Sequence, residues 1–377
     1  MSQRVGRLRK SLLAVLLTLA MAMGMAACSA PPKEQASTNP PVASQPSVPE
    51  PTTPQQPPST TPSQPTTSQP STQPSTPPEE QPSSPSPSTS EPTSSEPTTA
   101  SGDLVVRFLE VGQGDSIFIS LPDDTCMLID AGPRSAGDNV VAAIRALSET
   151  TIDYAVFTHP HEDHIGGAPA VFSAFDIKAV WMPRTSHTTQ TYENLLLAIQ
   201  NEGLSINEAK AGKVIFDKGN LRAWLLSPAG AYDDLNNMSA VVALSYGETT
   251  FIFEGDAEEE AETAMTLTSS LQLPDCDVLK VAHHGSSSST TTSFLEMVSP
   301  EIAVICVGAG NSYGHPTEST LDRLAAAGAE VYRTDQHGTV TITTDGLALK
   351  VETEKTPASS SETVVPVAPT TPKPSSD

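Results

Sequence analysis

Residues 158–167 read Thr-His-Pro-His-Glu-Asp-His-Ile-Gly-Gly and follow a short apolar run that predicts a strand over 154–158. Pro160 ends that strand, because it has no backbone N–H to donate. The loop after it carries side chains that bind metal ions well, namely His159, His161, Asp163 and His164. Two imidazoles two residues apart can share one ion, and the adjacent Asp and His can turn toward another. Such a dense cluster exceeds what a solvated polar turn needs, so the segment predicts a metal site.

The sequence around this segment alternates between strand and helix patterns. Apolar runs over 104–111, 115–121 and 125–130, separated by turn residues, predict a meander of three strands. Strand and helix patterns then alternate to about residue 201, and the stretch 221–351 repeats this order loosely. Two halves of mixed strands, each followed by helices, favour two face-to-face sheets with helices outside. Periodicity alone also allows a doubly wound sheet.

Further Asp and His side chains stand directly after predicted strands. They are Asp130, the pair Gly255-Asp256 and the pair His283-His284, which end or follow the runs 125–130, 250–254 and 278–282. Because each comes at the carboxyl end of a strand, we expect these separate parts of the chain to converge on one edge of the sheets.

The His-x-His-x-Asp-His pattern, followed in order by Gly-Asp and a late His, resembles the metallo-β-lactamase superfamily. The resemblance implies an α/β fold, the αββα sandwich, in which two mixed β-sheets lie face to face with helices outside. It also implies a site for two divalent metal ions, which Asp256 bridges and Asp130 braces. The other ligands that it implies are His159 and His161 for one ion, Asp163 and His164 for the other, and one of His283 and His284, with His284 preferred.

More narrowly, four motifs resemble the extracellular domain of competence proteins of the ComEC family. They are Val-Gly-Gln-Gly-Asp-Ser over 111–116, Asn-Asn-Met-Ser over 236–239, His-His-Gly-Ser over 283–286 and Tyr-Gly-His-Pro over 313–316. The resemblance covers residues 103–352 and implies supporting or substrate-contacting roles for Gln113, Asp115, Asn236, Asn237, Ser239, Ser286 and His315. The membrane channel of that family has no counterpart among the apolar runs of this sequence, so we do not expect DNA uptake to carry over.

The sequence departs from the wider superfamily at one ligand. That superfamily often places a metal-binding His between the His-rich loop and Gly-Asp, where this chain offers Asn236, Asn237 and Ser239. Asn is a poor ligand for transition metals beside imidazole. We therefore expect occupancy of the His159/His161 position to depend on metal concentration.

The resemblance implies a metal-dependent hydrolase, and three functions remain open. The first is a phosphodiesterase or nuclease, in which two ions, Zn or Mn, activate a water for attack on phosphorus. Asp163 would orient that water, and His315 would contact the substrate or leaving group. The others are a hydrolase of lactones, thioesters or amides, and a surface-binding module with a relict site. The retained His and Asp positions favour an enzyme, and the ComEC-like motifs favour a phosphodiester substrate, either a small molecule or a nucleic acid.

The N-terminal part of the chain predicts export and tethering. Residues 1–28 combine basic residues with an apolar run and end Met-Ala-Ala-Cys, which resembles a bacterial lipobox with Cys28 as the lipidated residue. Residues 29–102 are rich in Pro, Ser and Thr and predict a disordered linker, and 354–377 predict a disordered tail. We therefore expect a hydrolase domain over 103–353 at the extracellular face of the membrane, attached to it only through the Cys28 lipid. No obligate protein partner is evident.

The expected domain is strongly acidic, with 13 Lys and Arg against 35 Asp and Glu over 101–353, a net charge of −22. A field of this sign repels polyanions unless cations intervene, and the basic residues form no cluster in the sequence. Lys280 is the basic residue that we expect to face a phosphate. Glu258–Glu260 and Glu262 are expected to form the solvated, acidic start of a helix. His187 lies outside any motif and is expected to be an ordinary loop residue.

Overall fold

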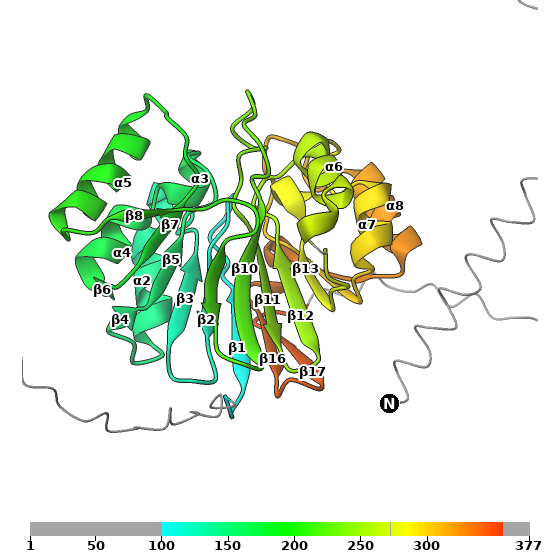
Figure 1. Cartoon of the computed structure of the whole chain (residues 1–377), viewed down its shortest axis with the longest axis horizontal. Coiled ribbons are helices and arrows are strands. Elements are labelled where there is room, and N and C mark those ends of the chain that lie inside the picture. Colours follow the sequence, from blue (N-terminus) through cyan, green and yellow to red (C-terminus); the bar gives the residue numbers. More distant parts are fainter. Residues whose placement is uncertain (1–99, 272, 357–377) are drawn as a thin grey trace, which may run out of the picture. The chain divides into compact units, whose positions relative to one another are not determined.

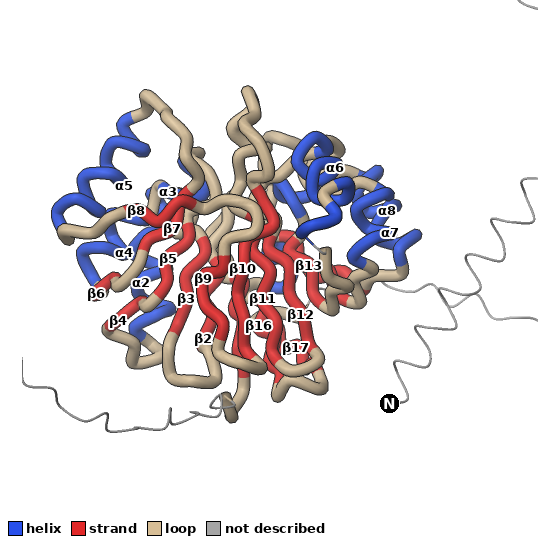
Figure 2. The backbone as a smooth tube through the Cα atoms, in the orientation of Figure 1, coloured by secondary structure: helices blue, strands red, loops and turns tan. Residues whose placement is uncertain are grey.

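The computed structural model describes residues 100–271 and 273–356. The predicted signal peptide, Cys28, nearly all of the predicted linker and most of the tail lie outside these residues. Two β-sheets occupy the middle of the described part, and helices flank them on both sides (Figures 1 and 2). This arrangement confirms the αββα sandwich and excludes the doubly wound alternative.

The first sheet contains eight strands, antiparallel from β17 to β3 and parallel from β3 to β8. In spatial order they are β17 (Leu349–Thr353), β16 (Val340–Thr344), β1 (Leu104–Phe108), β2 (Ile117–Ser120), β3 (Cys126–Ile129), β5 (Tyr154–Val156), β7 (Val180–Met182) and β8 (Ile206–Glu208). The antiparallel pairing of β1, β2 and β3 confirms the predicted meander.

The second sheet contains seven strands, parallel from β15 to β12 and antiparallel from β12 to β9. In spatial order they are β15 (Glu330–Arg333), β14 (Ile302–Ile305), β13 (Val278–Lys280), β12 (Thr249–Phe253), β11 (Val241–Tyr246), β10 (Leu221–Ser227) and β9 (Val214–Asp217). β4 (Thr151–Ile152) and β6 (Asp176–Ile177) form a separate, parallel two-stranded sheet.

Each sheet has its own helices on its outer side, as Figure 1 shows. The first sheet packs against α2 (Gly137–Arg145), α4 (Ala168–Ala174) and α5 (Gln190–Asn201), and the second against α6 (Glu259–Leu267), α7 (Thr292–Val298) and α8 (Glu318–Ala327). Shorter helical turns are η1 (Arg134–Ala136), α3 (Glu162–Ile165), η2 (Ser269–Leu271), η3 (Ala282–Gly285) and α9 (Thr334–His337). In the described part of the chain, no helix has both the length and the apolar character that crossing a membrane requires.

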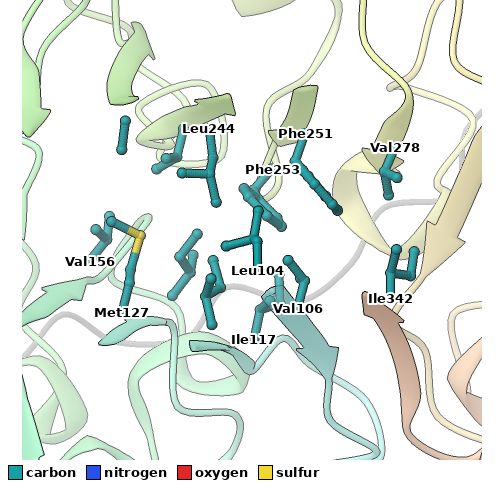
Figure 3. Packing of buried hydrophobic residues seen from close by; sticks show 14 of the residues in the cluster. Leu104, Val106, Ile117, Met127, Val156, Leu244, Phe251, Phe253, Val278 and Ile342 are labelled. Carbon is teal, nitrogen blue, oxygen red and sulfur yellow. The ribbon is translucent and has the colours of Figure 1, made fainter. Parts of the chain in front are cut away.

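The main hydrophobic core lies between the two sheets (Figure 3). Leu104 and Met127 of the first sheet face Leu244 and Phe253 of the second, and all four are at most 1% exposed. Burial of one such side chain contributes roughly 1.5–3 kcal/mol relative to leaving it exposed. Two further clusters lie between each sheet and its helices, so the sheets are covered on both faces. This packing holds the strand ends in fixed relative positions.

Four short strands, β4, β6, β8 and β9, lie outside the predicted pattern. β8 shows why, because all three of its residues are exposed and it therefore has no apolar face to reveal it in the sequence. The parallel strands matter more for function. β3 and β5 in one sheet, and β12 and β13 in the other, end in the loops that carry the potential metal ligands.

Candidate metal centre

Asp130 fixes the start of the His-rich loop. It follows β3 with a positive φ of 56°, and its carboxylate accepts hydrogen bonds from the backbone N–H of Thr158 at 2.8 Å and from the Thr158 hydroxyl at 2.6 Å. Asp130 is fully buried. The loop that begins at His159 is therefore anchored to the end of β3, which is the bracing position that the sequence predicts for Asp130.

His164 lies in α3 and connects Asp130 to the middle of the site. Its Nδ1 is 2.7 Å from Asp130 Oδ2, and its Nε2 is 3.2 Å from Asp256 Oδ1. A ring nitrogen that donates to a carboxylate leaves the other nitrogen with a lone pair, the usual arrangement of a metal-binding imidazole. In this arrangement the metal-binding nitrogen of His164 would be Nε2, which faces Asp256 after β12 of the opposite sheet.

His159 and His161 form a second pair of imidazoles beside Asp256. His159 Nε2 lies 3.0 Å from His161 Nδ1 and 3.7 Å from Asp256 Oδ2. The other ring nitrogen of His159 is 3.1 Å from the Thr158 hydroxyl. Donors that share one zinc ion lie about 3.3 Å apart, given metal–nitrogen distances of 2.0–2.1 Å in a tetrahedron. The spacing of this pair is close to that value.

The two late histidines approach the same carboxylate from different sides. His284 donates from Nδ1 to the carbonyl of Cys306 at 2.9 Å, and its Nε2 lies 3.1 Å from Asp163 Oδ2 and 3.6 Å from Asp256 Oδ2. His283 Nε2 lies 3.8 Å from Asp256 Oδ2. The structure thus brings the other six predicted ligands near Asp256, from loops that are up to 125 residues apart in the chain.

The residues present fit a metal ion. His164 Nε2 and Asp256 Oδ1 are buried 3.2 Å apart, and neither makes a well-directed hydrogen bond to a described group. A cation between them would bind both atoms. One atom each of Asp163, His164, Asp256 and His284 lies within 4.8 Å of the others, and this mixed set of nitrogen and carboxylate donors suits Zn, Mn or Fe.

The electrostatics of the metal-free protein also favour a cation at this point. Burial disfavours the charged imidazole of His164, but the surrounding carboxylates, Asp256 first, outweigh it and raise the pKa of His164 well above its ordinary value. The same balance raises the pKa of His284 to about 9. Burial instead lowers the pKa of His159 well below its ordinary value. Metal binding at either imidazole would require the loss of a proton from the coordinating nitrogen, so metal affinity is expected to fall as the pH falls.

The expectation that Lys280 faces a phosphate is wrong. Its side chain is completely buried, its ammonium pairs with the carboxylate of Asp115, and it donates to the carbonyl of Gly255 at 3.0 Å. Burial opposes the charge, but Asp115 outweighs burial and the pKa of Lys280 lies above its ordinary value. The cause is the position of β13, which lies between β12 and β14 and is buried along its whole length. Lys280 is a cation beneath the metal centre.

The loop 111–116 supports the site through backbone and side-chain contacts. The N–H of Asp115 donates to the carbonyl of Asp163 at 3.1 Å, and Asp115 Oδ1 lies 3.4 Å from His284 Nδ1. Gly114 is required here, because a Cβ at this position would lie 2.1 Å from the carbonyl oxygen of Asp163. Gln113 Oε1 accepts from the N–H of Gly308 at 3.2 Å, which links this loop to the end of β14.

The segment 236–239 supplies hydrogen bonds to the backbone and side chains around the donor cluster. Asn237 Oδ1 accepts from the backbone N–H groups of Glu258 and Ala261 at 3.0 and 3.2 Å, and so caps the start of α6. The Ser239 hydroxyl accepts from the N–H of Asp256 at 3.1 Å. Asn236 Nδ2 donates to Glu258 Oε1 at 3.4 Å. The segment orients the residues that follow β12.

One side of the cluster reaches solvent. The side chains of Asp163 and His283 are 30% and 23% exposed, whereas those of His159, His164, His284 and Asp256 are at most 3% exposed. His315 lies at this opening, with its ring centre 5.5 Å from that of His283, and its Nδ1 is buried without a hydrogen-bond partner. The opening is therefore lined by groups that can hydrogen-bond a ligand.

The loop that carries His315 is held by one side chain. Asn311 Oδ1 accepts from the N–H groups of Tyr313 and His315 at 3.1 Å each, and Asn311 Nδ2 donates to the carbonyls of Gly308 and His315 at 3.0 and 2.6 Å. Nearby, the Ser286 hydroxyl lies 2.8 Å from that of Ser288, so Ser286 is part of a polar turn beside the late histidines.

The acidic start of α6 is not simply a solvated face. Glu258 Oε1 lies 2.9 Å from His283 Nδ1, and Glu262 is 1% exposed and accepts from the backbone N–H groups of Thr290 and Thr291. Only Glu259 and Glu260 match the expectation of solvent exposure. No local helical pattern marks Glu258, because it precedes α6 with an extended backbone, φ −106° and ψ −177°.

A family model described as the metallo-β-lactamase superfamily matches residues 109–309. The match covers more than half of the chain, and the chain belongs to this superfamily, whose members are metal-dependent hydrolases. The donor cluster around Asp256 stands where the strands of the two sheets end, in agreement with that assignment.

Within the superfamily, the chain is similar to competence proteins. ComE operon protein 3 of Bacillus subtilis is 33% identical over 254 residues, which cover 62% of this chain and 32% of that protein. Recombination protein 2 of Haemophilus influenzae is 27% identical over 243 residues, or 63% and 28% of the two chains. The chain therefore spans about a third of the length of the curated relatives it matches.

Solved structures match this chain at lower similarity. CmlA, a diiron β-hydroxylase from Streptomyces venezuelae, is 14% identical to this chain and has a TM-score of 0.42, with coverage of 65% of this chain and 55% of CmlA.

Proposed function

We propose that this chain is a metal-dependent phosphodiesterase that acts at the outer face of the cell membrane. The observation that carries the proposal is the solvent-facing side of the donor cluster, where the side chains of Asp163 and His283 are 30% and 23% exposed and the ring of His315 lies beside that of His283. These polar groups suit an anionic, oxygen-rich substrate better than an apolar one. The relative that is named a recombination protein points in the same direction, because nucleic acids are phosphodiesters.

In the proposed reaction, the donor cluster, Asp163 and His315 would have different roles. Divalent ions bound by the cluster would supply Lewis acidity toward a phosphoryl oxygen and a nucleophile at neutral pH. Asp163 keeps an exposed carboxylate edge that can accept a hydrogen bond from a water molecule and orient it. His315, fixed by Asn311, can hydrogen-bond a phosphoryl oxygen or the leaving group.

A substrate screen tests this function. We expect the purified protein, loaded with Zn or Mn, to hydrolyse bis-p-nitrophenyl phosphate and a dinucleotide, and to hydrolyse lactones, thioesters and β-lactams at least a hundredfold more slowly. The Asp256→Ala variant, purified in the same way, controls for contaminating phosphodiesterases. Turnover of a lactone or thioester without turnover of any diester would assign the site to the alternative class of hydrolase.

The proposed attachment to the membrane depends on lipidation of Cys28, which lies outside the described residues. The lipobox-like sequence before Cys28 supports attachment through a lipid on its sulfur. We expect wild-type protein in the membrane fraction and Cys28→Ala in the medium or in an unprocessed form, as judged by immunoblotting of both fractions. Equal membrane association of the two proteins would refute the lipid anchor.

A further inference from the structure

The loop that follows β14 carries an exposed aromatic side chain. Tyr313 is 69% exposed, whereas every other Phe, Tyr and Trp in residues 100–271 and 273–356 is at least partly buried. An aromatic ring stabilises a fold mainly through the apolar surface that it buries, and Tyr313 buries little. Packing in the folded protein therefore does not account for a ring at this position.

Tyr313 lies beside the opening of the donor cluster. Its ring stacks on that of His315, with ring centres 5.8 Å apart and planes inclined by 26°. The ring of His315 in turn lies 5.5 Å from that of His283, in an edge-to-face arrangement. His283 Nε2 is 3.8 Å from Asp256 Oδ2. Two ring contacts thus lead from the edge of the cluster to Tyr313.

The backbone that carries Tyr313 is ordered by the protein itself. Asn311 Oδ1 accepts from the N–H groups of Tyr313 and His315, and Gly314 between them has a positive φ of 74°, which favours glycine. His315 covers one face of the Tyr313 ring, and the exposure of Tyr313 leaves the opposite face open. A planar group can therefore stack on that face without first ordering the loop, which favours binding.

Stacking offers an attraction for nucleotides that the charge of this domain does not. The net charge over 101–353 is −22, and the buried Lys280 is paired with Asp115, so the field of the protein does not draw phosphates in. Every nucleobase has a flat π-face, and its stacking on an aromatic side chain requires no cation. An aliphatic phosphodiester has no such face and gains nothing from Tyr313.

We propose that Tyr313 stacks on the base next to the scissile phosphate, so that the preferred substrate is a nucleotide diester rather than an aliphatic one. A base is joined to its phosphate through a single sugar, so a phosphate at the opening brings its base toward the loop of His315 and Tyr313. The substrate preference rests on the proposed phosphodiesterase function, whereas the stacking contact can be measured by binding alone. The rival role for Tyr313 is to position His315 without any contact to substrate.

The kinetic test compares a thymidine dinucleotide with the same diester in which hydrogen replaces both bases, using the full chain loaded with Zn or Mn. We expect the wild type to prefer the dinucleotide in kcat/KM by about 5- to 100-fold, the range that base–aromatic stacking supplies. Tyr313→Leu is expected to remove most of this preference, and Tyr313→Phe to keep it. Leu347→Ala is the matched control and should change neither rate, because Leu347 is also 69% exposed but lies in the turn between β16 and β17.

An equal loss of rate on both substrates in Tyr313→Leu, with the preference retained, would overturn the proposal and leave Tyr313 as a positioning residue for His315. A wild type that prefers neither substrate would also overturn it.

A binding titration separates this proposal from the proposed function. The probe is a 2-aminopurine nucleotide, whose fluorescence is quenched when its base stacks. We expect quenching by the wild type and by Tyr313→Phe, and an affinity about 5- to 100-fold lower for Tyr313→Leu. If the wild type hydrolyses no diester, the phosphodiesterase function fails and this titration alone decides whether Tyr313 stacks on a base. Equal affinity of wild type and Tyr313→Leu, with circular dichroism showing that both are folded, would refute the stacking contact.

Discussion

At the scale of single residues, the site depends on how Asp256 is surrounded. Its two oxygens face different imidazoles, and its backbone N–H is held by Ser239. An aspartate that joins the two halves of a metal centre cannot be replaced by a neutral side chain without uncoupling them, because buried imidazoles and Asp163 would lose the carboxylate that they share. Asp256 is therefore the position at which a substitution distinguishes a metal site from a merely buried polar cluster.

The first prediction concerns Asp256→Ala. We expect it to lower bound metal from two ions to one or none after dialysis and to reduce phosphodiester hydrolysis by at least a thousandfold. Asp217→Ala is the matched control, because Asp217 is 56% exposed and pairs with Arg222 at the surface. Elemental analysis beside the diester assay measures both effects. Full activity in Asp256→Ala would exclude a mechanism that uses both ions.

The second prediction concerns the buried pair of Lys280 and Asp115. Removal of one partner leaves an uncompensated charge in the interior, which costs about 3–5 kcal/mol. We expect Lys280→Met to lower the free energy of unfolding by that amount, as measured by urea denaturation of the metal-free protein. Lys178→Met, which alters an exposed pair with Asp176, is expected to change it by less than about 0.5 kcal/mol. Equal stability of the two variants would show that Lys280 does not balance Asp115.

At the scale of elements, α6, α7 and α8 together hold the turn that follows the late histidines. Glu262 of α6 accepts from the backbone N–H groups of Thr290 and Thr291, directly before α7. Arg323 of α8 donates to the carbonyls of Thr290 and Ser289 at 2.9 and 2.7 Å. Because this turn is fixed to three helices, the strained backbone at η3 can keep its conformation without a metal.

The third prediction concerns Glu262→Ala. Hydrogen bonds to a charged acceptor contribute about 1.5–3 kcal/mol each, and the substitution leaves two backbone N–H groups without their acceptor. We expect a loss of about 3 kcal/mol in the free energy of unfolding and a lower affinity for metal. Glu260→Ala changes an exposed residue of the same helix and serves as control, with an expected change within about 0.5 kcal/mol. Wild-type stability of Glu262→Ala would mean that water replaces the carboxylate.

The sequence predicts the elements of this fold better than the contacts between them. The His-rich loop and Asp256 are recognisable because each combines a strand end with metal-binding side chains in a short stretch. The inward direction of Lys280 depends on the burial of β13 between two parallel neighbours, which no local pattern encodes. The contact between Glu258 and His283 likewise joins residues from α6 and η3, so it appears only when both have packed.

At the scale of the whole molecule, charge limits what can reach the site. The domain carries 13 basic and 35 acidic residues over 101–353. Its buried cation Lys280 is paired with Asp115 and does not face the opening. Several other basic side chains pair with carboxylates on the surface, as Lys218 does with Asp123 and Arg333 with Asp335. The field near the opening is therefore expected to be negative outside the metal centre itself.

The last prediction is that substrate size and salt act together. A small diester meets little of the negative field and reaches the ions directly, whereas a long DNA strand brings many phosphates against an acidic surface. We expect hydrolysis of bis-p-nitrophenyl phosphate and of a dinucleotide to exceed hydrolysis of long single-stranded DNA at low salt. The rate on DNA should rise as salt or divalent cations screen the repulsion, because the Debye length falls from about 30 Å at 0.01 M to about 10 Å at 0.1 M. Rates on the three substrates across a salt series measure this. Tight DNA binding that weakens as salt is added would contradict the prediction and indicate a basic groove, which would make a nuclease the better description of the enzyme.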